Sequence, residues 1–153
     1  MKRYIKSAVR DLSNSSIWDD RYTVAKNPAT RADVLEKLAH DSEMGIRYAV
    51  AGNPSTPDKV LSYLLDDNSI DVPRNVLMNS NTSDTTLKKY LNKFPGDFYA
   101  LTLILGRPNL NPDIKQVIAE ILKDALQSAS EITQRYAKLI YKDYFSRGRK
   151  SSS

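Results

Sequence analysis

The residues best suited to recognition chemistry are two arginine–tyrosine pairs, Arg21 with Tyr22 and Arg47 with Tyr48, which stand 26 residues apart. Arginine and tyrosine are enriched among the side chains that anchor protein interfaces, because each offers both a large contact surface and hydrogen-bond donors. Stacked repeats place equivalent side chains in a row. A row of this kind would form a binding surface, and Arg74, one residue out of register, would extend it imperfectly.

Two clusters of side chains could support acid–base catalysis. Trp18 beside Asp19 and Asp20 resembles the aromatic and acidic pairing that helical-repeat DNA glycosylases use on damaged bases, but it is equally typical of a turn with a capping acid. His40 precedes Asp41 at the end of an expected helix, where the helix dipole alone favours a histidine. We prefer the structural interpretation of both groupings and predict that the protein is not an enzyme.

Metal and cofactor chemistry finds little support in the composition. Asp66, Asp67 and Asp71 could surround a hard cation, but the glycine and closing glutamate of a calcium-binding loop are absent, and a solvated turn is the better interpretation. The chain has no cysteine, which excludes disulfides, thiolate metal sites and cysteine nucleophiles. Only five glycines are present, which argues against a phosphate-cradling loop. We expect no metal and no cofactor.

The positive charge lies at the two ends of the chain. The net charge of +5 divides into +3 over residues 1–12 and +4 over residues 131–153, which leaves −2 for the middle. A protein that follows a phosphate backbone along its repeats would carry a basic stripe through them. The C-terminal bases Arg147, Arg149 and Lys150 either bind nucleic acid or an acidic surface, or make the tail soluble.

The two Arg-Tyr pairs belong to a longer repeat with a period of 26 residues. A fixed period of this length is typical of stacked architectures, in which no unit buries its apolar face alone. A third unit is weaker, and a fourth keeps Pro108 and Pro112 after a small insertion. The matched positions are Arg21/Arg47, Tyr22/Tyr48, Val24/Val50/Val76, Ala25/Ala51, Asn27/Asn53/Asn79, Pro28/Pro54, Thr30/Thr56/Thr82, Leu35/Leu61/Leu87 and Leu38/Leu64.

Each unit carries signals for a pair of short helices. Asn53 suits a helix end because it tolerates the left-handed conformation, and Pro54 prevents the helix from continuing. Thr56 is predicted to cap the next helix through its hydroxyl, with Pro57 at the first helical position and Asp58 in the first turn. Apolar residues then follow helical spacing and predict a buried face: Val34, Leu35, Leu38 and Ala39 in one unit, and Val60, Leu61, Leu64 and Leu65 in the next.

The pattern VAxNPxT…L…LA from Val24 to Asp41, repeated from Val50, resembles the variant leucine-rich repeat, and DSEMGIR at residues 41–47 resembles HEAT repeats. The resemblance covers residues 21–91 well and 92–126 loosely. It implies a right-handed superhelix of paired helices. It also implies a second role for Arg47, which follows Asp41 by six residues: an Asp-to-Arg ladder that ties neighbouring units together, with the tyrosines packed between helices. The cysteine-ligated iron–sulfur module of some variant family members has no counterpart here.

The C-terminal third predicts longer helices. Asp97 is expected to cap a helix through Leu105 that ends at Gly106, and Asn111 is expected to open a longer one with Pro112 and Asp113 in its first turn. Ile114, Val117, Ile118, Ile121, Leu122 and Ala125 would form its buried face. A last helix from about Ser130 to Phe145 places Ile132, Tyr136, Ile140 and Tyr144 four residues apart.

The sequence therefore predicts an all-α fold: a right-handed α-solenoid of short helix pairs with longer C-terminal capping helices. It would form one domain over residues 1–146, with a cap (1–16), three repeats (17–92), a degenerate repeat with capping helices (93–146) and a disordered basic tail (147–153). No apolar run reaches the roughly 18 residues of a membrane span, so we expect a cytoplasmic protein without a membrane partner. The favoured function is a non-catalytic binding module that presents a curved surface to another protein, and the alternative is a HEAT-like nucleic-acid-binding protein that uses the Arg-Tyr row and the basic termini.

Overall fold

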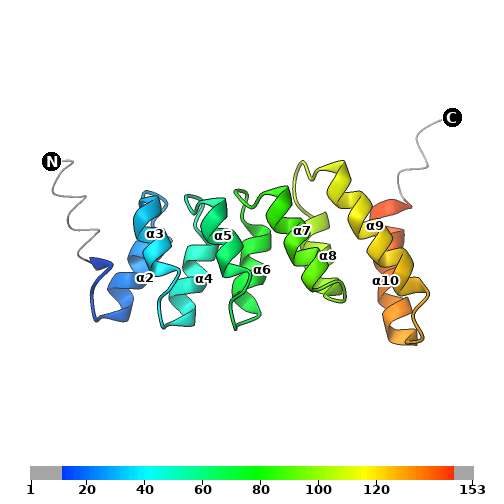
Figure 1. The fold of residues 1–153 in the computed structure, drawn as a ribbon, viewed down its shortest axis with the longest axis horizontal. Coiled ribbons are helices and arrows are strands. Elements are labelled where there is room, and N and C mark those ends of the chain that lie inside the picture. The colour runs from blue at the N-terminus through cyan, green and yellow to red at the C-terminus, as the bar shows by residue number, and fades with distance from the viewer. Residues whose placement is uncertain (1–11, 147–153) are drawn as a thin grey trace. The chain divides into compact units, whose positions relative to one another are not determined.

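The computed structural model describes residues 12–146, and within that range it contains helices and no strand. The all-α prediction is confirmed for this part of the chain. The first eleven residues and the predicted tail, with Arg147, Arg149 and Lys150, lie outside the described residues. The helices are α2 (Trp18–Lys26), α3 (Ala32–Leu38), α4 (Met44–Gly52), α5 (Asp58–Leu64), α6 (Asp71–Met78), α7 (Asp84–Lys93), α8 (Phe98–Leu105), α9 (Pro112–Leu126) and α10 (Glu131–Phe145) (Figure 1).

The chain consists of two compact units that divide between Thr86 and Leu87, within α7. The single domain expected from the sequence stays a prediction. Among the described helices, none combines the length and the apolar character that crossing a membrane requires.

In the first unit, α2 packs against α4 and α4 packs against α6, so these three helices form a row. α3 contacts α2 and α4, and α5 contacts α4 and α6 (Figure 1). The predicted apolar faces of α3 and α5 are buried, as are the three valines that recur every 26 residues, Val24, Val50 and Val76. The repeated apolar positions therefore line the interior of this unit.

Asparagine side chains tie successive short helices of the first unit together. Asn53 Nδ2 donates to the carbonyls of Ala25 (2.6 Å) and Asn27 (2.9 Å), and Asn79 Nδ2 donates to those of Ala51 (2.8 Å) and Asn53 (2.9 Å). Both amides are buried. The predicted left-handed conformation at Asn53 is wrong, because its backbone is extended (φ −74°, ψ 125°). Asparagine stands there for its amide, which donates to one carbonyl of the preceding helix and to the carbonyl of the preceding asparagine, and the latter also accepts a backbone N–H.

The recurring threonines also act differently from the prediction. Thr30, Thr56 and Thr82 each donate a hydroxyl hydrogen bond, of 2.5 to 2.6 Å, to the carbonyl of the valine six residues earlier. The prediction that Thr56 caps the following helix is therefore wrong: Pro57 is the N-cap residue and Asp58 begins α5. Thr56 is fully buried, and its hydroxyl meets the last turn of α4, where the Val50 carbonyl also accepts from the Asn53 N–H (3.1 Å).

The second unit begins its helices with side-chain caps, as predicted. Asp97 Oδ1 accepts from the Ala100 N–H at the start of α8 (3.0 Å), and Asn111 Oδ1 accepts from the Asp113 N–H at the start of α9 (2.9 Å). Gly106 ends α8 as its C-cap. Ser130 caps α10, which packs along α9 and also contacts α8. Three of these four helix boundaries follow directly from residue types.

The four residues that the sequence spaces four apart along α10 do not share one buried face. Ile140 is buried, whereas Ile132, Tyr136 and Tyr144 are exposed. Four residues turn an α-helix by about 400°, so a strict four-residue spacing drifts about 40° at each step. The four residues therefore point in successively different directions around the helix. The residues of α10 that are buried are Ala137 and Ile140.

Candidate functional site

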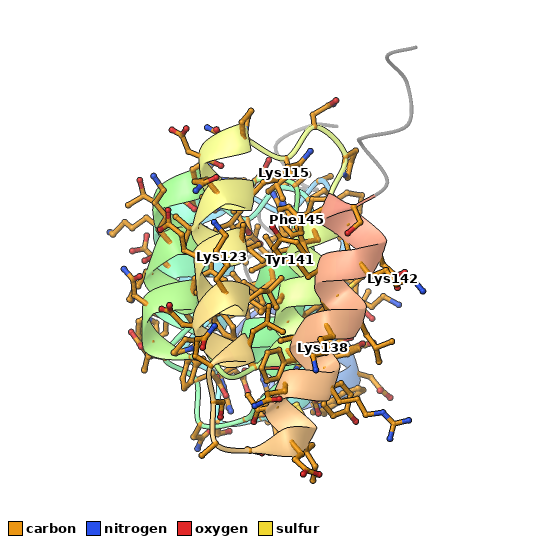
Figure 2. The ribbon with its side chains drawn as sticks, turned by 90° about the vertical axis from the view of Figure 1, so that its right-hand side faces the viewer. Lys115, Lys123, Lys138, Tyr141, Lys142 and Phe145 are labelled. Carbon is orange, nitrogen blue, oxygen red and sulfur yellow. The ribbon has the colours of Figure 1, made fainter. Side chains whose placement is uncertain are left out.

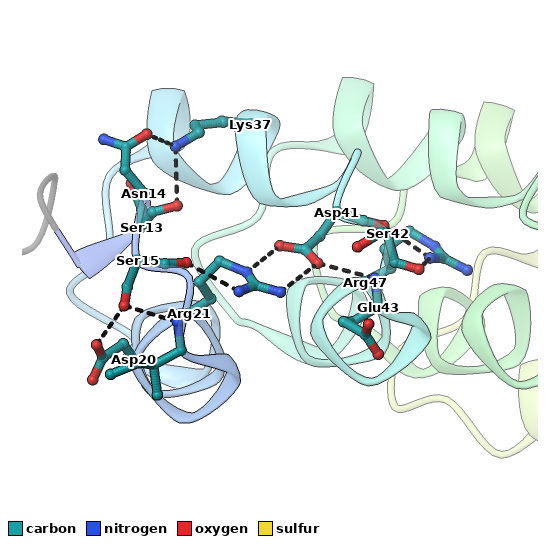
Figure 3. A network of polar contacts seen from close by, with 11 residues as sticks. Ser13, Asn14, Ser15, Asp20, Arg21, Lys37, Asp41, Ser42, Glu43 and Arg47 are labelled. Carbon is teal, nitrogen blue, oxygen red and sulfur yellow. Dashed lines mark hydrogen bonds and ion pairs between the residues drawn. The ribbon is translucent and has the colours of Figure 1, made fainter.

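The guanidinium group of Arg21 on α2 is held by its own chain. Its Nε donates to Asp41 Oδ2 (2.7 Å) and its Nη2 to Asp41 Oδ1 (3.2 Å), a two-pronged contact, while Nη1 donates to the Ser15 carbonyl (3.0 Å) (Figure 3). The side chains of Arg21 and Asp41 are only 15% and 9% exposed. Few of the Arg21 donors face solvent.

Arg47 on α4 repeats the arrangement 26 residues later. Its Nε and Nη2 donate to the two carboxylate oxygens of Asp67 (2.6 and 3.2 Å), and its Nη1 donates to the carbonyls of Asp41 (2.8 Å) and Ser42 (3.0 Å). The contact of Arg47 with the Asp41 backbone is visible in Figure 3. The chain thus carries an Arg–Asp ladder, formed by Arg21, Asp41, Arg47 and Asp67, of the kind that the HEAT-like spacing implied.

The ladder shifts the pKa of both carboxyl groups. Burial alone would raise the pKa of Asp41, but the hydrogen bonds from Arg21 and from the Glu43 N–H, with the charges of Arg21 and Arg47, lower it below its usual range. The pKa of Asp67 is also lowered: burial opposes the shift, and hydrogen bonds from Arg47 and the Ser69 N–H outweigh it. Both carboxylates are therefore stabilised in their charged form.

The next unit has no Arg–Asp pair at the equivalent position, because Pro73 stands 26 residues after Arg47. Pro73 is buried within α6. The predicted candidate Arg74 is the next residue along this helix and is half-buried. Arg74 therefore does not continue the row at the position of Arg21 and Arg47.

The tyrosines of the Arg-Tyr pairs border a groove across α2, α4 and α6. This groove has a volume of about 260 Å³ and is lined by Tyr22, Lys26, Tyr48, Ala49, Gly52, Asn53 and Asn75. The Tyr22 ring stacks on Trp18, with centroids 4.5 Å apart, and Lys26 Nζ lies 5.4 Å from the Tyr22 centroid. Tyr48 is 43% exposed. The structure thus brings Tyr22 and Tyr48 to one groove, whereas it commits Arg21 and Arg47 to the ladder.

Small residues and one amide shape the floor of the groove. Asn75 Nδ2 donates to the Tyr48 carbonyl (2.8 Å) and closely approaches Gly52, where an added Cβ would lie 2.7 Å from Nδ2. Trp18 packs in the same way over Gly45. The groove is lined by two phenol groups, one ammonium group and two side-chain amides, and none of its lining residues carries a carboxylate. Such a set can bind an anionic or hydrogen-bonding partner.

Sequence reasoning missed Lys26, Gly52 and Asn75. The spacing of Lys26, four residues after Tyr22, was a usable signal, because residues four apart lie on one face of a helix. Asn75 has no such signal, since its position depends on how α6 packs against α4.

The remaining predicted candidates lie elsewhere in the first unit. His40 packs against the Tyr63 ring (4.4 Å between centroids) beside a separate cavity of about 210 Å³ that Glu36 and Lys59 also line. Trp18, Asp19 and Asp20 begin α2, so the prediction of a turn with a capping acid is wrong: α2 has no side-chain cap, and Asp20 accepts a hydrogen bond from Ser15 Oγ (2.6 Å).

The aspartates considered as cation ligands do not form a metal site in the described part of the chain. Asp67 is bound by Arg47, and no group of three histidine or carboxylate side chains among residues 12–146 could hold a metal ion. Comparison of the chain with protein-family models, curated proteins and solved structures gives no match. The resemblance to variant leucine-rich and HEAT repeats stays an expectation from the sequence.

Proposed function

We propose that the chain is a right-handed α-solenoid built on a 26-residue unit and that it works as a non-catalytic module that binds another protein. The repetition of three contact types supports the solenoid. The Arg–Asp pairs, the asparagine amides and the threonine hydroxyls each recur with the same sequence separation in successive units. Units joined in this way build extended binding surfaces.

One observation supports the binding function most directly. Tyr22 and Tyr48 border a single groove, whereas the neighbouring Arg21 and Arg47 are bound to aspartates of the ladder. Exposed aromatic rings with little conformational freedom are effective interface anchors. Lys26 is the only charged residue that lines the groove. We therefore propose that the partner presents an extended segment with an acidic side chain near Lys26 and apolar or aromatic side chains against the tyrosines.

A peptide-display selection on the full chain tests this function. Selected peptides should carry acidic residues, and Tyr48→Ala should weaken their binding by about 10-fold or more, the loss of roughly 1.4 kcal/mol expected of an interface anchor. Tyr63→Ala is the matched control, because Tyr63 is a similarly exposed tyrosine on α5 that does not line the groove. Dissociation constants would be measured by fluorescence anisotropy.

Two outcomes would contradict this function. One is a set of selected peptides whose affinity is the same for Tyr48→Ala and for the unaltered chain. The other is an equal loss with Tyr63→Ala, which would place the contact outside the groove. Nucleic-acid binding, the second candidate function, draws little support from Arg21 and Arg47, because their donors already face carboxylates and carbonyls. Its support comes from lysines of the second unit.

A further inference from the structure

Four lysines of the second unit gather on the side of α9 and α10 shown in Figure 2. Lys115 and Lys123 lie two turns apart on α9, and Lys138 and Lys142 lie one turn apart on α10. All four are exposed. We call these residues, together with the aromatic pair Tyr141 and Phe145, the lysine surface.

The aromatic pair lies between the two helices in this view (Figure 2). The rings of Tyr141 and Phe145 stack with centroids 5.3 Å apart and planes at 25°. Both side chains are half-buried, so part of each ring stays accessible. The lysine surface therefore has aromatic faces flanked by positive charge from both helices.

Carboxylates do not neutralise this charge within residues 12–146. No ion pair in the described part of the chain involves any of the four lysines. Glu120 accepts a hydrogen bond from Gln116 on its own helix (3.0 Å), and Asp143 lies two residues from Tyr141, about 200° around α10. The five carboxylates of α9 and α10 are Asp113, Glu120, Asp124, Glu131 and Asp143. Asp113 and Glu131 lie in first helical turns, where the helix dipole favours an acid. Glu131 shares a shallow hollow with Lys138 and Arg135, but it forms no ion pair with Lys138.

We propose that the lysine surface binds a single-stranded nucleic acid, with the lysines on successive phosphates and the accessible faces of Tyr141 and Phe145 against unpaired bases. Single-strand binding proteins combine a positively charged path for the backbone with aromatic rings on which bases stack.

The chemistry favours a nucleic acid over a lipid surface. Insertion into a membrane needs exposed apolar side chains on the same side as the lysines. Leu139, which is exposed, lines a shallow hollow together with Lys138. The surface thus presents one aliphatic side chain beside two rings and four ammonium groups, which is a smaller apolar area than a membrane-inserting helix face offers.

A salt titration of the full chain with a labelled 20-nucleotide oligo-dT strand tests the proposal. If four lysines each neutralise one phosphate, the logarithm of the association constant should fall with the logarithm of salt concentration with a slope of about −2.8. Binding should then weaken roughly 50-fold between 50 and 200 mM salt.

Paired variants separate a site from net charge. Lys138→Gln with Lys142→Gln should make the slope shallower by about 1.4, because two phosphate contacts are lost. The control, Lys59→Gln with Lys88→Gln, changes the net charge equally at exposed residues outside the surface and should leave the slope unchanged. Tyr141→Leu should weaken binding roughly 5- to 150-fold at constant slope, because it removes the stacking of one base. Circular dichroism would establish that each variant is folded.

Four results would overturn the proposal. They are no binding to the strand at 50 mM salt, equal losses in the two double-glutamine variants, affinity for a duplex that matches the single strand and is insensitive to Tyr141→Leu, and binding to vesicles of phosphatidylserine without binding to the strand. A slope that responds only to Lys138 and Lys142, together with a loss on Tyr141→Leu, would support it.

Discussion

The Arg–Asp ladder of the first unit and the lysine surface of the second unit use positive charge in opposite ways. In the ladder, Arg21 and Arg47 each meet a carboxylate through two hydrogen bonds and are largely withdrawn from solvent. In the lysine surface, four ammonium groups are exposed and none forms an ion pair among the described residues. The difference suggests a rule that can be tested: cations paired with a carboxylate stabilise the fold, and cations without such a partner are available to the ligand that we propose.

The largest effect tests the buried apolar interior of the first unit, which contains the repeated leucines and valines. Leu61 is fully buried between the helices of the first unit, so Leu61→Ala should lower the free energy of unfolding by about 2 to 5 kcal/mol through lost transfer energy and a cavity. Urea denaturation would measure the change. Ile70→Ala, at a residue that is 57% exposed, should change it by less than about 0.5 kcal/mol. A loss below about 1 kcal/mol at Leu61 would contradict the proposed packing.

The next effect addresses the ladder directly. Asp67→Ala should lower the free energy of unfolding by about 3 kcal/mol, because it leaves the largely buried Arg47 guanidinium without its carboxylate. The matched control is Asp33→Ala, which breaks an exposed pair with Arg31 and should cost about 0 to 1 kcal/mol. Equal losses in the two variants would show that burial does not distinguish the ladder from surface ion pairs.

A pH titration sharpens the same comparison. The folded pKa values of Asp41 and Asp67 are lowered, so each group contributes stability that is present above its unfolded pKa, near 4, and is lost as the pH falls through its folded pKa. The free energy of unfolding should therefore decline below about pH 4. In Asp67→Asn the decline should be shallower, and an unchanged pH profile would remove Asp67 as a source of the acid sensitivity. Chemical denaturation at fixed pH values would measure it.

The smallest effect belongs to the lysine surface. Lys138→Gln with Lys142→Gln should change the free energy of unfolding by less than about 0.5 kcal/mol, because both side chains are exposed and have no ion-pair partner in the described range. Thermal and urea unfolding would measure the change. A loss above about 1 kcal/mol would assign these lysines a structural role like that of the arginines.

The sequence predicted local features whose cause is local. Asp97 and Asn111 cap their helices as predicted, because a cap depends on a residue and the next two or three amides. The cap predicted at Thr56 was wrong. The pattern Thr-Pro-Asp fits a cap, but in the folded chain the Thr56 hydroxyl donates to the Val50 carbonyl of the preceding helix. The direction of a buried hydroxyl depends on packing, which a short pattern does not contain.

Contacts between distant residues were predicted in type but not in detail. The spacing of Asp41 and Arg47 indicated a ladder, yet the carboxylate that Arg47 binds belongs to Asp67, and Asp41 gives Arg47 only its carbonyl. Tyr22 and Tyr48 were predicted as candidates, but the groove that they share includes Asn75, which only the packing of α6 brings there. The lysine surface arises because α10 folds back along α9, and the sequence alone does not give that register.

The asparagine contacts have a consequence for how this chain could change in length. Each amide of Asn53 and Asn79 donates to two carbonyls that lie 26 and 28 residues earlier, so each unit binds the end of the helix before it. A duplicated segment of 26 residues that carries its own asparagine, arginine and aspartate would bring all the groups needed to join the row. Whole units could therefore be added within the first unit as far as Pro73. At that position proline replaces the arginine that would bind the next aspartate.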